Sequence, residues 1–172
     1  ALPDLISTLR TKPSNMIYES LSALQNITAP SSSTQAAFLL HDLIEKVQIA
    51  ALDTQGLLRN RSALPDLRDV YAHARNKKVR VTALNAIAQM PEAQDRDLLG
   101  RCLSDKETGI RAAAAEGLGR LQDPANRQTV QNAFDQEEKP EPRMALAFAD
   151  VMLGNRDMSE FAPLRYLVNQ LN

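Results

Sequence analysis

Ile110-Arg111-Ala112-Ala113-Ala114-Ala115-Glu116-Gly117-Leu118 is an alanine-rich segment with helical apolar spacing. Related segments occur at 79–87, at 142–149 and, more loosely, at 16–24. Arg80, Arg111 and Arg143 occupy the same slot in three of them. The string Ala-Leu-Pro-Asp-Leu also occurs twice, at residues 1–5 and 63–67, which is two periods of about 31 residues. Self-similarity at a fixed period of this size predicts a solenoid of repeated units.

Each unit has the pattern of two helices, the second of which carries the alanine-rich segment. The sequence predicts an all-α, right-handed α-solenoid of about five antiparallel helix pairs that form one domain. We expect units near 1–29, 33–60, 63–91, 94–122 and 125–154, and a capping helix over 158–171. The second unit is the least faithful copy. Asp150 falls in the slot of Ile87 and Leu118, so either the fifth unit shifts by a residue or a carboxylate lies beside the core.

Composition narrows the class of protein. Of 172 residues 44% are hydrophobic, 4% are aromatic and none is Trp, which favours small-residue helix packing. The net charge of −1 gives no global reason to expect nucleic acid or an anionic membrane as a partner. The single cysteine, Cys102, excludes an internal disulfide and fits a buried position. No apolar run has the length of a membrane span. A cytoplasmic location is favoured; a removed leader and a larger parent protein both stay open.

The segment from Asp105 to Pro124 resembles the short bacterial HEAT repeat, of the phycobilisome-lyase-type HEAT-like kind. The resemblance implies an armadillo-like α-solenoid. It also implies a structural ladder between neighbouring units, made by an acidic residue at the turn and an arginine six positions later. Asp105 with Arg111 and Glu137 with Arg143 have this spacing, whereas Arg80 has Ala74 six residues before it.

The sequence offers little for catalysis. Only two histidines are present. His41 and Glu45 have i, i+4 spacing, but two ligands make a weak metal site, and His73 with Asp69 is a common helix pair. The run 117–119, Gly-Leu-Gly, lies inside a helical pattern, where close helix approach explains it better than a phosphate loop. We therefore expect no enzyme activity, no metal and no cofactor.

Solenoids commonly bind their partners on the concave side, which the second helices line. The repeat offset aligns two positions on each of these helices. We predict that these positions form the binding stripe for a protein or peptide: Asn85, Gln89, Glu116, Arg120, Phe148 and Met152. The stripe becomes apolar toward its end. In the alternative interpretation, Phe148 and Met152 pack beneath the final helix.

Two other functions stay open. The family name suggests a bilin or chromophore lyase, or a lyase-associated subunit. The basic run 75–80, Arg-Asn-Lys-Lys-Val-Arg, gives a local charge that suits nucleic acid, although a solvated turn explains it as well.

Overall fold

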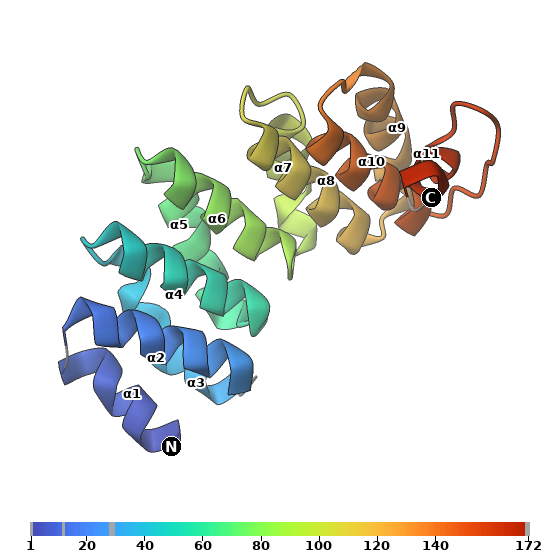
Figure 1. Ribbon diagram of the computed structural model, residues 1–172. Coiled ribbons are helices and arrows are strands. Elements are labelled where there is room, and N and C mark those ends of the chain that lie inside the picture. Colours follow the sequence, from blue (N-terminus) through green and yellow to red (C-terminus); the bar gives the residue numbers. More distant parts are fainter. Residues whose placement is uncertain (1, 12, 28–29, 171–172) are drawn as a thin grey trace. The chain divides into compact units, whose positions relative to one another are not determined.

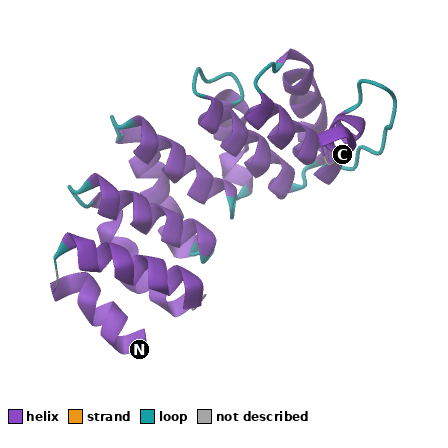
Figure 2. Cartoon of the chain, in the orientation of Figure 1, coloured by secondary structure: helices purple, strands orange, loops and turns teal. Residues whose placement is uncertain are grey.

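The computed structural model describes residues 2–11, 13–27 and 30–170, and these residues form helices, turns and loops without a strand (Figure 2). The chain divides into two compact units, residues 1–90 and 91–172, called here the N-terminal unit and the C-terminal unit. Successive helices pack against one another within each unit. The prediction of an all-α solenoid is confirmed.

Two layers of helices build the N-terminal unit. The second helices α2, α4 and α6 lie side by side, and α1, α3 and α5 pack against them (Figure 1). Leucines of both layers, such as Leu24 and Leu67, are fully buried between them. In chain order the unit comprises α1 (Leu2–Thr11), α2 (Ser14–Ile27), α3 (Pro30–Ala36), a 3₁₀ helix (Ala37–His41), α4 (Glu45–Leu57), a 3₁₀ helix (Arg61–Ala63), α5 (Leu64–His73) and α6 (Lys77–Ala88).

The C-terminal unit repeats this arrangement. The second helices α8 and α10 pack together, α7 and α9 pack on them, and α11 packs on α10. Its core includes Leu99, Ile110 and Phe134. Its elements are a 3₁₀ helix (Ala93–Asp95), α7 (Arg96–Cys102), α8 (Thr108–Leu121), a 3₁₀ helix (Pro124–Asn126), α9 (Arg127–Gln136), α10 (Pro140–Met152) and α11 (Pro163–Gln170).

A polar side chain holds the turn before four of the second helices. Each accepts a hydrogen bond from the backbone N–H two residues later, which satisfies a donor that the helix itself leaves unpaired. The four acceptors are Asp42 (2.8 Å), Asn76 (2.8 Å), Asp105 (2.9 Å) and Glu137 (2.9 Å).

Two glycines let the second helices approach closely. A Cβ atom at Gly56 would lie 2.8 Å from Ala86 Cα, and one at Gly119 would lie 2.9 Å from Ala149 Cα. Because such distances are shorter than real Cβ contacts, any side chain would push the helices apart. The prediction of close helix approach at the Gly-Leu-Gly run is confirmed for Gly119.

Asp150 lies in the core without a shift of register. The contact of Gly119 with Ala149 spans the same 30 residues as that of Gly56 with Ala86, so the repeat offset is kept. Asp150 is fully buried, and its Oδ2 accepts a hydrogen bond from Asn155. Of the two alternatives, the carboxylate beside the core is the correct one.

The final helix was predicted too early. It begins at Pro163 rather than at 158, and the predicted end at residue 171 lies outside the described residues. Asp157 accepts hydrogen bonds from both the N–H and the hydroxyl of Ser159, and the Ser159 carbonyl accepts one from the N–H of Ala162. These contacts fold the residues before Pro163 into a turn.

The second predicted unit also differs from the structure. Its first helix begins at Pro30, ahead of the predicted start at 33, and continues as a 3₁₀ helix to His41. The chain then leaves helical geometry at Asp42 before α4 begins at Glu45. His41 and Glu45 therefore do not share one helix face, and that interpretation was wrong.

The helix pairs α5–α6, α7–α8 and α9–α10 fall within the units placed at 63–91, 94–122 and 125–154. The single-domain assignment stays a prediction.

Candidate functional site

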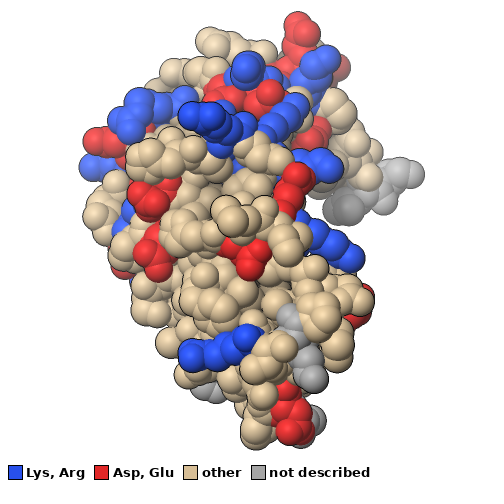
Figure 3. Space-filling view, turned by 90° about the vertical axis from the view of Figure 1, so that its left-hand side faces the viewer, with Lys and Arg blue, Asp and Glu red and all other residues tan. Residues whose placement is uncertain are grey.

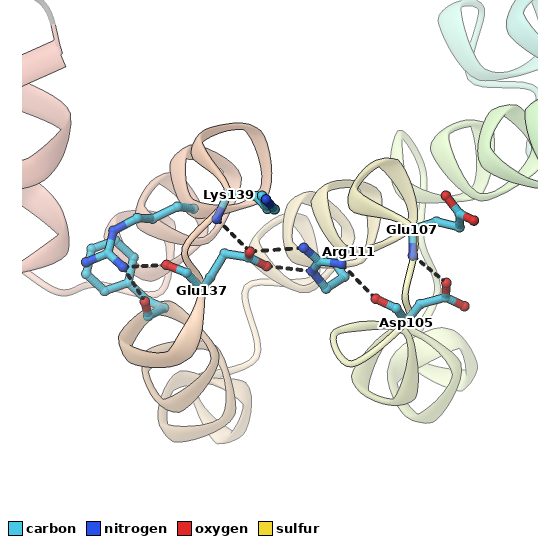
Figure 4. A network of polar contacts seen from close by, with 7 residues as sticks. Asp105, Glu107, Arg111, Glu137 and Lys139 are labelled. Atoms are coloured by element: carbon cyan, nitrogen blue, oxygen red, sulfur yellow. Dashed lines mark hydrogen bonds and ion pairs between the residues drawn. The ribbon is translucent and has the colours of Figure 1, made fainter.

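The ladder residues come together at the turns of the C-terminal unit (Figure 4). Arg111 Nε donates to Glu137 Oε2 at 2.5 Å and its Nη2 donates to Oε1 at 3.0 Å. Its Nη1 donates to the backbone carbonyl of Asp105 at 2.8 Å. The Asp105 carboxylate itself caps α8 at Glu107 N. The spacing of six therefore gives a carbonyl contact, and the carboxylate partner of Arg111 comes from the next helix pair.

The second predicted pair, Glu137 with Arg143, follows the same rule. Arg143 Nη1 donates to the carbonyls of Glu137 and Phe134, not to the Glu137 carboxylate. Its guanidinium lies over the rings of Phe134, 4.3 Å from the centroid, and Tyr166, 5.3 Å from the centroid. Arg80 similarly lies 5.5 Å from the Tyr71 ring centroid. Both arginines pack on aromatic rings, and Arg143 also binds carbonyls at the end of α9, as structural cations do.

An open pocket of about 420 Å³ lies over the ladder. Arg111 and Glu137 form part of its lining, and both already bind each other. The hydrogen bond from Arg111 holds the pKa of Glu137 below its ordinary value, against the opposing effect of burial. A carboxylate whose pKa is lowered by a bound guanidinium is a poor proton carrier near neutral pH, so this arrangement suits a structural role.

The C-terminal half of the predicted stripe lies on α8 and α10. Glu116 and Arg120 form an i, i+4 ion pair and are both half-buried. Phe148 is 49% exposed, and Met144, one turn before it, is 45% exposed. Met152 is half-buried, close to Gly119 on α8. Because Phe148 stays exposed, its predicted packing beneath the final helix is wrong.

The N-terminal half of the stripe lies on α6, where Asn85 is exposed and Gln89 is half-buried. The same register reaches α4 at Asp53 and Leu57, 32 residues earlier, and both are exposed. These two residues were not among those predicted from the sequence. The 32-residue offset from Asn85 and Gln89 was the signal that would have found them. We call the exposed slots on α4, α6, α8 and α10 the second-helix faces.

The described residues offer no group of three or more His, Cys, Asp or Glu side chains that could hold a metal ion. His73 pairs with Asp69 at 3.1 Å, and Cys102 is buried. In the basic run, Asn76 caps α6, and the side chains of Arg75, Lys77 and Lys78 are exposed at this turn.

The family model for HEAT repeats matches residues 64–149, from the start of α5 into α10. The chain belongs to the HEAT-repeat family. A comparison with curated proteins found no match to the sequence. None of the helices in the described part of the chain has the length and apolarity needed to cross a membrane.

Two solved structures resemble this HEAT-repeat chain. One is a chain of the complex of CpcE and CpcF of phycocyanin lyase from a Nostoc species, with a TM-score of 0.65 and 19% identity. That match covers 87% of this chain and 97% of the other. The other is an engineered protein, with a TM-score of 0.62 and 15% identity, covering 98% of this chain and 84% of that one. At such identities the similarities show the fold alone.

Proposed function

We propose that this HEAT-repeat chain is a non-catalytic interaction module that binds a protein or peptide on its second-helix faces. The observation that carries the proposal is the exposure of large apolar side chains on α4 and α10. Leu57 is 61% exposed, and Phe148 and Met144 are about half exposed. Apolar side chains that gather on a helical repeat surface mark contact sites, because water contact costs free energy that a partner can recover.

The ion pair on α8 adds specificity to this surface. Glu116 and Arg120 neutralise each other, and Phe148 is the residue in the Glu116 slot of the next helix. A partner that covers Phe148 would contact an apolar centre with polar groups beside it, which is the anatomy of an ordinary protein interface. The arrangement supports recognition of a folded or helical segment rather than a small metabolite.

Site-specific photocrosslinking tests the proposal. A photoreactive phenylalanine analogue is placed at Phe148 or Asn85 on the second-helix faces, and at Asp135 on the exposed side of α9 as the matched control. We expect a partner to be crosslinked in cell extract from Phe148 and from Asn85, and not from Asp135. Crosslinks from Asp135 alone, or from none of the three positions, would contradict the proposal.

A second candidate is a lyase-associated subunit. It is favoured by the similarity to the phycocyanin lyase structure, which extends over nearly the whole of that chain. Retention of a bilin, seen as visible absorbance that co-elutes with the protein, would favour this function over the first. Retention of nucleic acid that falls steeply with salt would instead point to the basic run 75–80.

A further inference from the structure

One repeat position of the second-helix faces carries an acidic residue on two helices, Glu116 on α8 and Asp53 on α4. Only the first of these has a basic partner on its own helix. On α8, Glu116 is paired with Arg120 one turn later. On α4, the corresponding residues are Asp53 and Leu57, so the position of the cation is taken by an apolar side chain. The Asp53 carboxylate makes no hydrogen bond or ion pair with any described residue. The same two repeat positions therefore hold an ion pair on α8 and a carboxylate without its cation on α4.

The nearest basic residue before Asp53 on α4, Lys46, is too far away to form an ion pair with it. Lys46 lies two turns away, roughly 10 Å along the helix, and its Nζ lies 3.7 Å from the centroid of the Tyr18 ring. Cations are scarce here, since only three of the 20 lysines and arginines of the chain fall within residues 1–58. Figure 3 shows few charged side chains in the lower part of the molecule, where the N-terminal helices of the chain lie.

The surroundings of Asp53 favour an incoming charge of opposite sign. Protein atoms crowd around the carboxyl group although it faces solvent, and this partial burial raises its pKa. A carboxylate that has lost part of its hydration gains more from a cation than a fully hydrated one does. Leu57, on the same face, offers apolar surface to the aliphatic stem of a long basic side chain.

We propose that Asp53 and Leu57 receive an arginine side chain of the partner, whose guanidinium binds the Asp53 carboxylate and whose stem and apolar neighbours cover Leu57. Charge complementarity and the Glu116–Arg120 pair in the same chain define this occupant. Arginine suits the position because its planar guanidinium binds a carboxylate through two hydrogen bonds. The inference rests on the proposed function, since it names the partner chemistry of the same faces.

A peptide titration tests it on the intact chain. The probe is acetyl-Ala-Leu-Arg-Leu-Ala-amide, and its matched control carries the neutral isostere citrulline in place of arginine. Binding is followed by amide chemical shifts of the ¹⁵N-labelled protein. We expect the arginine peptide to shift signals of α4 and to bind about three- to fivefold more tightly than the citrulline peptide, the range of a partly exposed ion pair. Equal binding of the two peptides, or shifts confined to the C-terminal unit, would overturn the inference.

Three variants sharpen the test. Asp53→Asn should remove the preference for arginine, and Glu45→Gln, the same charge change elsewhere on α4, should keep it. Leu57→Arg recreates the α8 pairing within α4, so it should close the site and reduce arginine-peptide binding to the citrulline level. All three positions are exposed, and circular dichroism verifies that each variant is folded. Arginine preference that survives in Asp53→Asn would contradict the proposal.

The two proposals fail in different ways. If the crosslinks at Phe148 and Asn85 are present but arginine preference is absent, only the role of Asp53 is lost. If arginine preference is present but the crosslinks come from Asp135, the site on α4 stands and the part of the proposed surface on α6 and α10 is wrong.

Discussion

Arg111 binds both carboxylate oxygens of Glu137 and so joins the α7–α8 pair to the α9–α10 pair. Their side chains are only 15% and 8% exposed. We expect Glu137→Gln to lower the free energy of unfolding by about 3 kcal/mol, because it leaves a nearly buried guanidinium without its counter-charge. Urea denaturation measures the change. The control is Asp123→Asn, which removes the exposed Arg96–Asp123 ion pair (2.8 Å) and should cost less than about 1 kcal/mol. Equal losses in the two variants would contradict a special role for Glu137.

The same pair predicts how stability depends on pH. The hydrogen bond from Arg111 lowers the pKa of Glu137 in the folded protein. The carboxyl group of Glu137 therefore binds a proton less tightly in the folded state than in the unfolded chain. The ion pair stabilises the fold fully above the ordinary glutamate pKa of about 4.3. That stabilisation is lost as the pH falls through the lowered pKa. The difference in unfolding free energy between the original protein and Glu137→Gln should shrink when urea denaturation is repeated from pH 7 down to pH 3. A difference that does not vary over this range would contradict the assignment.

The 31-residue period was enough to predict the fold, but not the partners within the ladder. The family resemblance named Asp105 and Arg111, six residues apart, as members of a ladder between neighbouring units, and that spacing places the guanidinium at the Asp105 carbonyl. Its carboxylate partner, Glu137, depends on how closely two helix pairs stack, which no local spacing encodes. Asp53 and Leu57 were missed for another reason. The second unit, with a 3₁₀ helix and a turn before α4, is the least faithful copy, so the 32-residue offset was not extended to it.

Glycine substitutions separate close packing from helix propensity. At Gly119 a Cβ would lie 2.9 Å from Ala149 Cα, whereas at Gly100 on α7 no atom lies within 4 Å. We expect Gly119→Ala to destabilise the protein by about 1–3 kcal/mol, since the overpacking outweighs the gain in helix propensity. Gly100→Ala should stabilise it by up to about 1 kcal/mol, because only the propensity changes. Thermal unfolding of the two variants under one condition makes the comparison. A gain in stability from both substitutions would show that α8 and α10 do not pack this closely.

Asp150 should make the fold less stable at neutral pH than its neutral amide would. Burial raises the pKa of its carboxyl group, and the hydrogen bond from Asn155 and the charge of Arg127 oppose this rise only in part. The folded state then binds this proton more tightly than the unfolded chain, so its contribution to stability falls as the pH rises from the ordinary aspartate pKa of about 3.9 through the raised value. Asp150→Asn keeps an acceptor for the Asn155 amide without the charge.

We therefore expect Asp150→Asn to raise the free energy of unfolding by about 1 kcal/mol at pH 7, and by less near pH 4. Asp150→Leu restores the residue type of Leu118, but it leaves the buried Asn155 amide without its acceptor, so its gain should be smaller. Urea denaturation of both variants at the two pH values distinguishes the effects. If Asp150→Asn is less stable than the original protein at pH 7, the ionised carboxylate contributes more to this core than its burial costs.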